Sequence, residues 1–559
     1  MSSPALYGAS LLLCMSWLAS NHYPPWVAAH SELLAALAAA LLLLSATVGS
    51  RTSGLRIPRA AMFLGVLAVV PLAQAVAGHI VFFGDAWIAA LYVMCAACCV
   101  VASTEMASRP ASRWPVLFAA VLLSGAIASS WIAWVQNFQL DAGFLGLYVI
   151  GVKPGHAPYA NLAQPNQLAT LLGLGMAGVF CLFEMGRVSK GVALATAGWL
   201  AITMGLTLSR TPLLLFLAAG VTLWMGGQRL RLRTATSVVA ALAVVWGASF
   251  LLLPTLSEVL GLSSGGALAG RAQVGPRLVI WSQLWDAVWL RPLTGFGWNQ
   301  VSMAQVAVAE AHPLSRMTEH SHNLVLDLLL WNGVPLAILA IGVACWWLAG
   351  RIRRLRSVTG VFGLLAVSLL LAHSMVEFPL DYLYFLVPFG IALGLVEVDN
   401  EKHREPRIAQ RFAGGATAMV FGLIALGAWD YWRVEEAYRD MRFTVARVGR
   451  PMVTQPPPPP TTQFTQLAAF HTFSLMPPRP GMSEVELAWM RDVAHRYGYA
   501  PSLYRYALAQ ALNGDQAGAR LTMLQLKQLH GDVRYLEGKR ELEELVGGEP
   551  KFFEQLRLP

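Results

Sequence analysis

The chain has 559 residues, of which 56% are hydrophobic and only 13% are charged, and its mean hydropathy is +0.53. A soluble globular protein does not need so much apolar surface, so the composition excludes that class and predicts a polytopic membrane protein. The net charge of +9 would suit a nucleic-acid partner, but the excess lies in loops where membrane topology explains it, so we expect no such partner.

Thirteen apolar segments are candidates for membrane-spanning helices, because roughly 20 apolar residues cross a bilayer. The first lacks a basic leading region and a cleavage site, so we expect it to be a retained span. The first and eighth are short, which predicts an all-α bundle of about 11–13 spans. The segments are 5–19, 31–48, 60–77, 86–104, 115–135, 167–184, 191–208, 211–226, 235–254, 324–349, 358–375, 379–397 and 413–430.

The loops between these segments alternate in charge. Every second loop is basic, whereas the short loops on the other side hold only Lys153 and Arg210. Since lysine and arginine near membrane ends stay in the cytoplasm, the N-terminus is predicted inside and the C-terminus outside. The 18 predicted cytoplasmic cations are Arg51, Arg56, Arg59, Arg109, Arg113, Arg187, Lys190, Arg229, Arg231, Arg233, Arg351, Arg353, Arg354, Arg356, Lys402, Arg404, Arg407 and Arg411.

Residues 1–430 are predicted to form the transmembrane domain, in which 255–323 is the largest outer loop. The loop opens with a Gly/Ser-rich stretch around Ser263–Gly266, and apolar residues then recur at helical spacing over 277–289. This spacing predicts an amphipathic helix at the outer membrane–water boundary. Residues 431–460 predict a helical extension and a polyproline linker, and 461–559 a soluble helical domain that resembles a tetratricopeptide hairpin.

The six cysteines lie inside apolar stretches, so no disulfide framework is predicted. Cys95, Cys98 and Cys99 are close in sequence, but they have no histidine or carboxylate nearby and are predicted to pack as small side chains. We expect no metal site and no cofactor.

A first polar cluster lies where an outer loop enters the sixth predicted span, and it contains Asn161, Gln164 and Asn166. Pro165 disfavours helix at the residue before it, so a helix is predicted to begin at about Asn166. The N–H groups of a helix N-terminus suit a phosphate. An ordinary polar helix cap remains the alternative.

Two outer arginines form the second and third clusters. Arg210 lies in a tight turn between spans seven and eight, and Arg277 follows Gly275-Pro276, with a glycine-rich turn at 292–298 nearby. Charges at that depth are costly and usually functional, and arginine binds phosphate bidentately. Together the two would neutralise a diphosphate leaving group without a metal. The alternative for Arg210 is contact with lipid headgroups.

The fourth cluster, Glu319, His320, His322 and Asn323, lies immediately before the tenth span. Histidine titrates near working pH and can accept a hydroxyl proton, which favours general-base chemistry. A plain polar loop, or a metal site whose further ligands are not evident, are the alternatives.

The fifth cluster lies between spans eleven and twelve, where Pro379 is predicted to start a helix. Its ionisable and aromatic residues either line the site or pair structurally with Arg210 or Arg277, and both interpretations remain open. They are His373, Glu377, Asp381 and Tyr382.

Together the five clusters resemble the O-antigen ligase/polymerase (WaaL/Wzy) superfamily of bacterial inner membranes, and within it the PglL type of protein O-oligosaccharyltransferase. The resemblance covers roughly residues 150–400. The Gln-Pro-Asn and Glu-Phe-Pro-Leu elements point to the protein-modifying branch. The motifs are Asn161–Ala169, Ser209-Arg210, Arg277 with Trp281, the turn Pro292–Gly297, His320–Asn323 and Glu377–Tyr382.

The resemblance implies a GT-C-like fold with a periplasmic site in a Gram-negative inner membrane, working as an inverting, metal-independent enzyme. Arg210 and Arg277 would hold the diphosphate. His322, or else His320, would deprotonate the acceptor, and His322 is favoured because it is closer to the helix start. Glu377 and Asp381 would orient an arginine or the acceptor. The other residues predicted to bind substrate are Gln164, Asn166, Asn161, Asn323, Glu319, Tyr382 and His373.

We therefore predict transfer of a preassembled oligosaccharide from undecaprenyl diphosphate to serine or threonine of a periplasmic protein, such as a pilin. Transfer to lipid A-core, or to a second glycan as in a polymerase, is the nearest alternative. A transporter of lipid-linked glycan, and a scaffold acting through its C-terminal domain, are alternatives from other classes.

Overall fold

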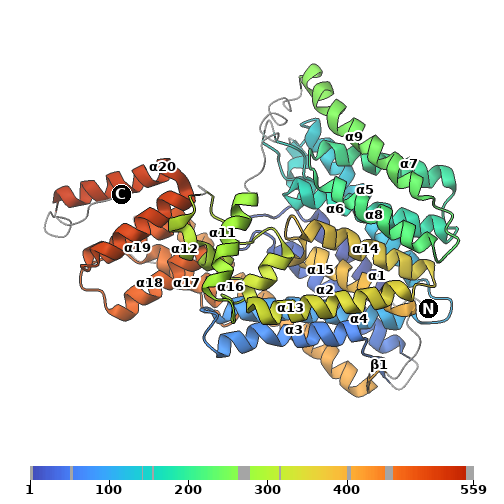
Figure 1. Ribbon diagram of the computed structural model, residues 1–559, viewed down its shortest axis with the longest axis horizontal. Helices are drawn as coiled ribbons and strands as arrows, with labels where there is room; N and C mark the ends of the chain where they lie inside the picture. Colours follow the sequence, from blue (N-terminus) through green and yellow to red (C-terminus); the bar gives the residue numbers. More distant parts are fainter. Residues whose placement is uncertain are drawn as a thin grey trace. The chain divides into compact units, whose positions relative to one another are not determined.

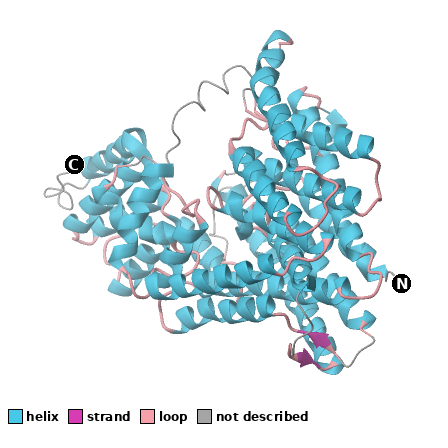
Figure 2. Ribbon diagram, turned by 45° about the vertical axis from the view of Figure 1, so that its right-hand side comes forward, coloured by secondary structure: helices cyan, strands magenta, loops and turns pink. Residues whose placement is uncertain are grey.

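The computed structural model describes residues 4–50, 54–141, 143–153, 156–261, 277–313, 316–399, 405–446 and 457–548, which are mostly helical (Figures 1 and 2). The chain divides into two compact units. The first comprises residues 1–68, 91–274 and 343–426, and the second 69–90, 275–342 and 427–559. Several predicted features lie outside the described residues, namely Arg51, Ser263–Gly266, Gly275, Pro276, Lys402, Arg404 and Pro456.

Each of the thirteen predicted apolar segments overlaps one helix. Among the described residues, eight helices are long and apolar enough to cross a membrane. The all-α polytopic class is therefore confirmed, and the exact number of spans stays a prediction. The helices are α1 (Pro4–Leu18), α2 (Ala29–Gly49), α3 (Arg59–Val76), α4 (Phe83–Ala107), α5 (Trp114–Asn137), α6 (Pro165–Glu184), α7 (Lys190–Leu206), α8 (Thr211–Gly227), α9 (Thr236–Val259), α13 (Leu324–Arg353), α14 (Val358–Ser374), α15 (Leu383–Val396) and α16 (Gln410–Val445).

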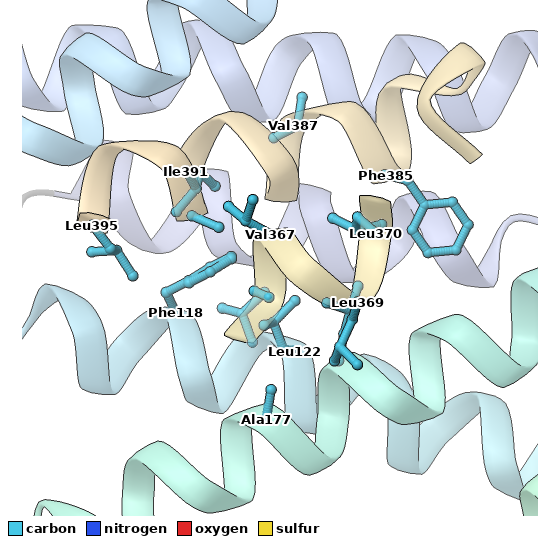
Figure 3. Close-up of a cluster of buried hydrophobic side chains, with 14 of the residues drawn as sticks. Phe118, Leu122, Ala177, Val367, Leu369, Leu370, Phe385, Val387, Ile391 and Leu395 are labelled. Atoms are coloured by element: carbon cyan, nitrogen blue, oxygen red, sulfur yellow. The ribbon is translucent and has the colours of Figure 1, made fainter. Parts of the chain in front are cut away.

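The core of the first unit is formed where α5, α6, α14 and α15 pack together. Figure 3 shows apolar side chains of these four helices, among them Phe118, Leu122, Ala177, Leu369 and Phe385, gathered in one buried cluster. Close packing of this kind, and not a strongly amphipathic pattern, holds helices together in an apolar solvent.

Small residues let α15 approach α4 closely. A Cβ added at Gly390 would lie 2.7 Å from the carbonyl oxygen of Ala96, and one at Gly394 would lie 2.7 Å from that of Val100. These distances leave no room for a side chain, so both glycines are required for the backbone-to-backbone contact.

Loops that the charge pattern assigns to the same side of the membrane contact one another. The short strands β1 (Leu55–Arg56) and β2 (Arg407–Ile408) pair antiparallel, and Figure 2 shows them in magenta. A guanidinium N–H of Arg229 donates to the carbonyl oxygen of Arg353 at 2.9 Å. The buried Arg351 pairs with Glu397 at 2.9 Å. These contacts support the division of the loops into two alternating sets.

The second unit joins the large outer loop to the C-terminal helices. The loop forms α11 (Arg277–Leu290), α12 (Val301–Val308) and the 3₁₀ turn η3 (Ala309–Ala311), and α11 matches the predicted amphipathic helix. The C-terminal helices are α17 (Thr465–Leu475), α18 (Glu484–Tyr497), α19 (Ala500–Leu512) and α20 (Gln516–Gly548). Helix α12 was not predicted from the sequence.

One hydrophobic core runs through α12, η3, α19 and α20. Val306 and Ala309 of the loop are buried in the same cluster as Leu503, Ala507 and Leu526 of the C-terminal helices. The C-terminal helices therefore share a hydrophobic core with the outer loop. The predicted boundaries at residues 430 and 461 stay predictions.

The residues just before α17 contact α16. Helix α16 runs on through the predicted helical extension to Val445. The carboxylate of Asp430 then accepts hydrogen bonds from the hydroxyl of Thr461 at 2.5 Å and from the N–H of Gln463 at 2.9 Å. This contact fixes the end of the proline-rich segment beside α16.

Candidate active site

The predicted site residues divide between the two units. The first unit holds Asn161, Gln164, Asn166, Arg210, His373, Glu377, Asp381 and Tyr382. The second unit holds Arg277, Glu319, His320, His322 and Asn323.

Glu377 is the centre of the first group. Its side chain is only 4% exposed, and its carboxylate accepts hydrogen bonds from the amide of Asn166 at 2.7 Å and that of Gln164 at 3.3 Å. A buried carboxylate is costly unless such donors satisfy it. Two clusters that are more than 200 residues apart in sequence therefore meet in space.

The start of α6 has the geometry predicted from Pro165. Gln164 is the N-cap residue with extended backbone, and Pro165 is the first helical residue. The proline ring fixes the backbone angle that a helix needs and removes one N–H that would have no partner there. Asn166 and Gln164 are thus held on both sides of the helix start, facing Glu377.

The turn that carries Arg210 joins the same network. The hydroxyl of Ser209 donates to the side-chain oxygen of Asn166 at 2.6 Å and accepts the N–H of Thr211 at 3.1 Å. Leu208 has a positive φ of 48°, which makes the turn tight. Arg210 is exposed and is the N-cap residue of α8. The N-termini of α6 and α8 therefore lie beside each other.

Two residues that were predicted to bind substrate form hydrogen bonds within the protein. The amide of Asn161 donates to the carbonyl oxygens of Leu18 and Tyr148, both at 2.7 Å, and its oxygen accepts the N–H of Ile150 at 3.0 Å. His373 is fully buried, with Nδ1 2.8 Å from the hydroxyl of Thr170. These contacts support a structural role for both residues.

Gln136 organises the loop before α6 and was missed from the sequence. Its amide nitrogen donates to the carbonyls of Ile150 at 2.8 Å and Ala160 at 2.9 Å. Its oxygen accepts the N–H groups of Tyr159 at 3.1 Å and Ala160 at 2.8 Å. An amide side chain in the last turn of an apolar helix, beside Asn137, was the signal of this role.

The segment after Glu377 departs from the prediction that Pro379 starts a helix. Pro379–Asp381 form one 3₁₀ turn, η4, and α15 begins only at Leu383, because Tyr382 between them has extended backbone. The ring of Tyr382 stacks on those of Phe378 and Tyr384, at centroid distances of 5.9 and 5.0 Å. This stacking sets the direction of the turn that carries Asp381.

In the second unit, the histidines lie on a short loop that is pinned at Ser321. The N–H of this buried serine donates to the carboxylate of Asp327 at 2.9 Å, and its carbonyl accepts the indole N–H of Trp281 at 2.9 Å. Trp281 lies one helical turn after Arg277 on α11. The helix that carries the second arginine thus contacts the histidine loop directly.

His322 has an unusual backbone conformation. Its φ of 58° lies in the left-handed region, which few non-glycine residues adopt, although histidine does so more often than most. The neighbours enforce it, since the Ser321 hydroxyl donates to the carbonyl of Asn323 at 2.8 Å and Asn323 caps α13 by accepting the N–H of Val325 at 3.0 Å. Such strain clusters at functional sites. Asn323, predicted to bind substrate, serves here as a helix cap.

Hydrogen bonds with the side chain of Gln305 hold the histidine loop. The amide oxygen of Gln305 accepts the N–H of Thr318 at 2.8 Å, and its nitrogen donates to Gln283 at 2.9 Å. The Thr318 hydroxyl in turn donates to the carbonyl of His320 at 2.6 Å. Among the residues that the structure describes, no three His, Cys, Asp or Glu side chains gather as metal ligands would.

Helix α13 is broken at Gly333, which has φ of 72° and ψ of 170°. The turn at 292–297 forms hydrogen bonds with the backbone groups that have no helical partner at the break. Val334 N–H donates to Pro292 O at 2.7 Å, and Phe296 N–H donates to Leu330 O at 2.6 Å. A Cβ at Gly333 would lie 2.5 Å from the backbone of Leu293. The glycine-rich turn therefore completes the helix break, as irregular backbone in an apolar environment requires.

Comparison with known proteins places this architecture in a family. A model described as "Protein glycosylation ligase" matches residues 158–182, one described as "O-Antigen ligase" matches 195–341, and one described as "Virulence factor membrane-bound polymerase, C-terminal" matches 361–540. A general O-oligosaccharyltransferase of Acinetobacter baylyi is 29% identical over 406 residues, 70% of this chain and 69% of that protein. The chain is similar to the PglL-type O-oligosaccharyltransferases of the O-antigen ligase superfamily.

A second relative, the ComP-specific O-oligosaccharyltransferase of the same organism, is 27% identical to this chain over 248 residues, 44% of each chain. The three matched ranges contain Gln164 and Asn166, then Arg210, Arg277 and both histidines, and finally Glu377. The third range also runs through α17, α18 and α19. The chain is therefore a multi-pass glycosyltransferase, and its match to the polymerase model includes C-terminal helices.

Proposed function

We propose that this protein moves a preassembled oligosaccharide en bloc from undecaprenyl diphosphate to serine or threonine hydroxyls of periplasmic proteins such as pilins. Similarity to the PglL-type enzymes supports a lipid-linked donor and a protein acceptor. The observation that carries the proposal is the network of Gln164, Asn166, Ser209 and Glu377, which brings two helix N-termini and the turn of Arg210 together.

The donor diphosphate would bind at this network. The N-termini of α6 and α8 each present N–H groups and a partial positive charge, and Arg210 adds a full one. Glu377 is already satisfied by two amide donors, so its charge is partly offset before a phosphate arrives. In the second unit, Arg277 is half-buried at the start of α11 and would supply a second guanidinium. Stabilising a leaving group in this way is usually the largest electrostatic contribution to catalysis.

The acceptor hydroxyl would lose its proton to a histidine of the 320–322 loop. Its oxygen bonds to the anomeric carbon from the face opposite the leaving group, the bond from that carbon to the diphosphate breaks, and the configuration inverts. His322 is favoured as the base because it lies closer than His320 to the start of α13. Because the arginines and helix N-termini supply the positive charge, the reaction is proposed to need no metal.

We place the site on the periplasmic face of the inner membrane of a Gram-negative bacterium. The alternation of basic loops supports this orientation, since the loops assigned to the cytoplasm contact each other through β1 with β2 and through Arg229. Asn166, Ser209 and Glu377 belong to the opposite set of loops and likewise meet one another.

Transfer to lipid A-core remains the second candidate, because the "O-Antigen ligase" model covers residues 195–341. The shorter protein-glycosylation match at 158–182 favours a protein acceptor. The test is transfer by the purified enzyme in the presence of a chelator, with a defined undecaprenyl-diphosphate oligosaccharide and, separately, a pilin or lipid A-core.

The expected result is a mass shift on the pilin. The variant His322→Ala should lower the rate at which the shifted pilin forms about 10²–10⁴-fold. Transfer to lipid A-core alone would contradict the proposed acceptor. If His320→Ala abolished transfer and His322→Ala did not, the base would be His320. Loss of transfer on chelation that added metal restores would contradict the metal-independent mechanism.

A further inference from the structure

The histidine loop is contacted by the C-terminal helices as well as by the helices of its own loop. The hydroxyl of Tyr499 donates a hydrogen bond of 2.5 Å to the carboxylate of Glu319, the residue next to His320. Beside it, Met317 packs on Gly498, where an added Cβ would lie 2.7 Å from the methionine methyl carbon. Residues 180 or more apart in sequence thus form a close polar and apolar contact.

Tyr499 is itself held rigidly. It is the N-cap residue of α19, and its ring contacts those of Phe470 and Tyr497, each at a centroid distance of 5.8 Å. Three residues earlier, the guanidinium of Arg496 binds the carboxylate of Asp85 with two hydrogen bonds of 2.7 and 2.8 Å. Arg496 is 8% exposed and Asp85 2% exposed, so this pair anchors the segment in a buried position.

The bond from Tyr499 to Glu319 is of the strong kind. Burial raises the pKa of Tyr499, and the negative charge of Glu319 raises it further, so the phenol stays protonated and remains a donor. A hydrogen bond from a neutral hydroxyl to a carboxylate is shorter and stronger than one between neutral groups. It therefore restrains Glu319 even though the glutamate lies on an irregular segment.

We propose that Tyr499 is a positioning residue for oligosaccharide transfer, which acts through Glu319 to hold the loop of His320 and His322 in its reactive geometry. The inference rests on the proposed function, because it takes this loop to carry the base. The helices α11 and α12 fix the loop at Ser321 and Thr318, and Tyr499 fixes it at Glu319, which lies between them. The C-terminal helices are then part of the active site's framework.

The test compares two single-atom changes. Tyr499→Phe removes the hydroxyl and keeps the ring. Tyr497→Phe is the matched control, since the Tyr497 hydroxyl donates to the carbonyl of Gln466 at 2.8 Å, within the C-terminal helices. Both variants are measured as full-length protein for melting temperature, kcat, and KM for donor and acceptor.

Tyr499→Phe is expected to lower kcat about 10- to 100-fold with donor KM unchanged, because a small misplacement of a reacting group costs that much. Its melting temperature should fall no further than that of Tyr497→Phe, which keeps wild-type kcat. In a Glu319→Ala background, where kcat is already reduced, adding Tyr499→Phe should change kcat less than about two-fold, because coupled residues are not additive.

Wild-type kcat in Tyr499→Phe would overturn the positioning role, and so would an equal loss in Tyr497→Phe. The role would also be overturned if Tyr499→Phe lowered kcat by the same factor in the Glu319→Ala background as in the wild-type enzyme. This comparison also tests the positioning role if Tyr499→Phe folds poorly alone. Wild-type enzyme that glycosylates no protein acceptor would instead contradict the proposed function. The same variants would then be compared with lipid A-core as acceptor.

Discussion

Replacing Asn166 by Asp changes one group at the centre of the proposed diphosphate site. The amide nitrogen that donates to Glu377 at 2.7 Å becomes an oxygen, while the Ser209 hydroxyl can still donate to the other oxygen. Two ionised carboxylates at that separation repel by about 6 kcal/mol at an effective dielectric constant of about 20. A hydrogen bond to a charged group, worth about 1.5–3 kcal/mol, is lost as well.

Because the protein cannot hold both charges at that distance, the pair must separate or take up a proton. Proton uptake becomes easier as the pH falls. We therefore expect Asn166→Asp to lower kcat/KM for the donor at least about 10-fold at neutral pH. The ratio of its rate to the wild-type rate should rise as the pH is lowered from about 8 to about 6.

The assay is transfer from a defined lipid-linked oligosaccharide to a pilin across this pH range, with both enzymes measured in parallel. Asn166→Ala is the control, because it removes the donor without adding a charge and should give a ratio independent of pH. A pH-independent ratio for Asn166→Asp would refute the placement of Asn166 against an ionised Glu377.

Two further changes test the framework of the second unit. Asp85→Asn removes the charge that faces the buried Arg496, and breaking a buried ion pair from one side costs about 3–5 kcal/mol, so we expect a clear fall in melting temperature; an unchanged melting temperature would contradict the pairing. Gly333→Ala places a Cβ 2.5 Å from the Leu293 backbone at a positive φ and should reduce the yield of folded protein, whereas Gly342→Ala, which has open space, should not; equal yields would contradict the interlocked break.

The sequence predicted the helices well and the contacts between them poorly. Apolar segments of membrane-spanning length are a local property, and Pro165 marks a helix start within one residue, so both could be predicted. Helix α12 was missed because it is short and buries its apolar face against helices about 200 residues later in the chain.

The partners of Glu377 show the same limit. The sequence left open whether Glu377 lines the site or pairs with Arg210 or Arg277, and it did not predict the hydrogen bonds from the amides of Gln164 and Asn166 that the structure shows. Amides and arginines can both satisfy a carboxylate, and a single sequence does not reveal which of them the packing brings within reach. The roles of Asn161 and Asn323 were likewise hidden, because a side chain that caps a helix or holds a loop has the same composition as a substrate ligand.

The shared core of α12, α19 and α20 imposes an order on biosynthesis. The turn at 292–297 is translated before Gly333, so the partner of the broken helix already exists when α13 leaves the ribosome. Val306 and Ala309, in contrast, must wait for Leu503 and Leu526, which are among the last helical residues to be made. Until then Val306 and Ala309 lack these packing partners, and Glu319 lacks Tyr499. If Tyr499 positions the histidine loop as proposed, a chain that ends before this tyrosine inserts without being competent for transfer.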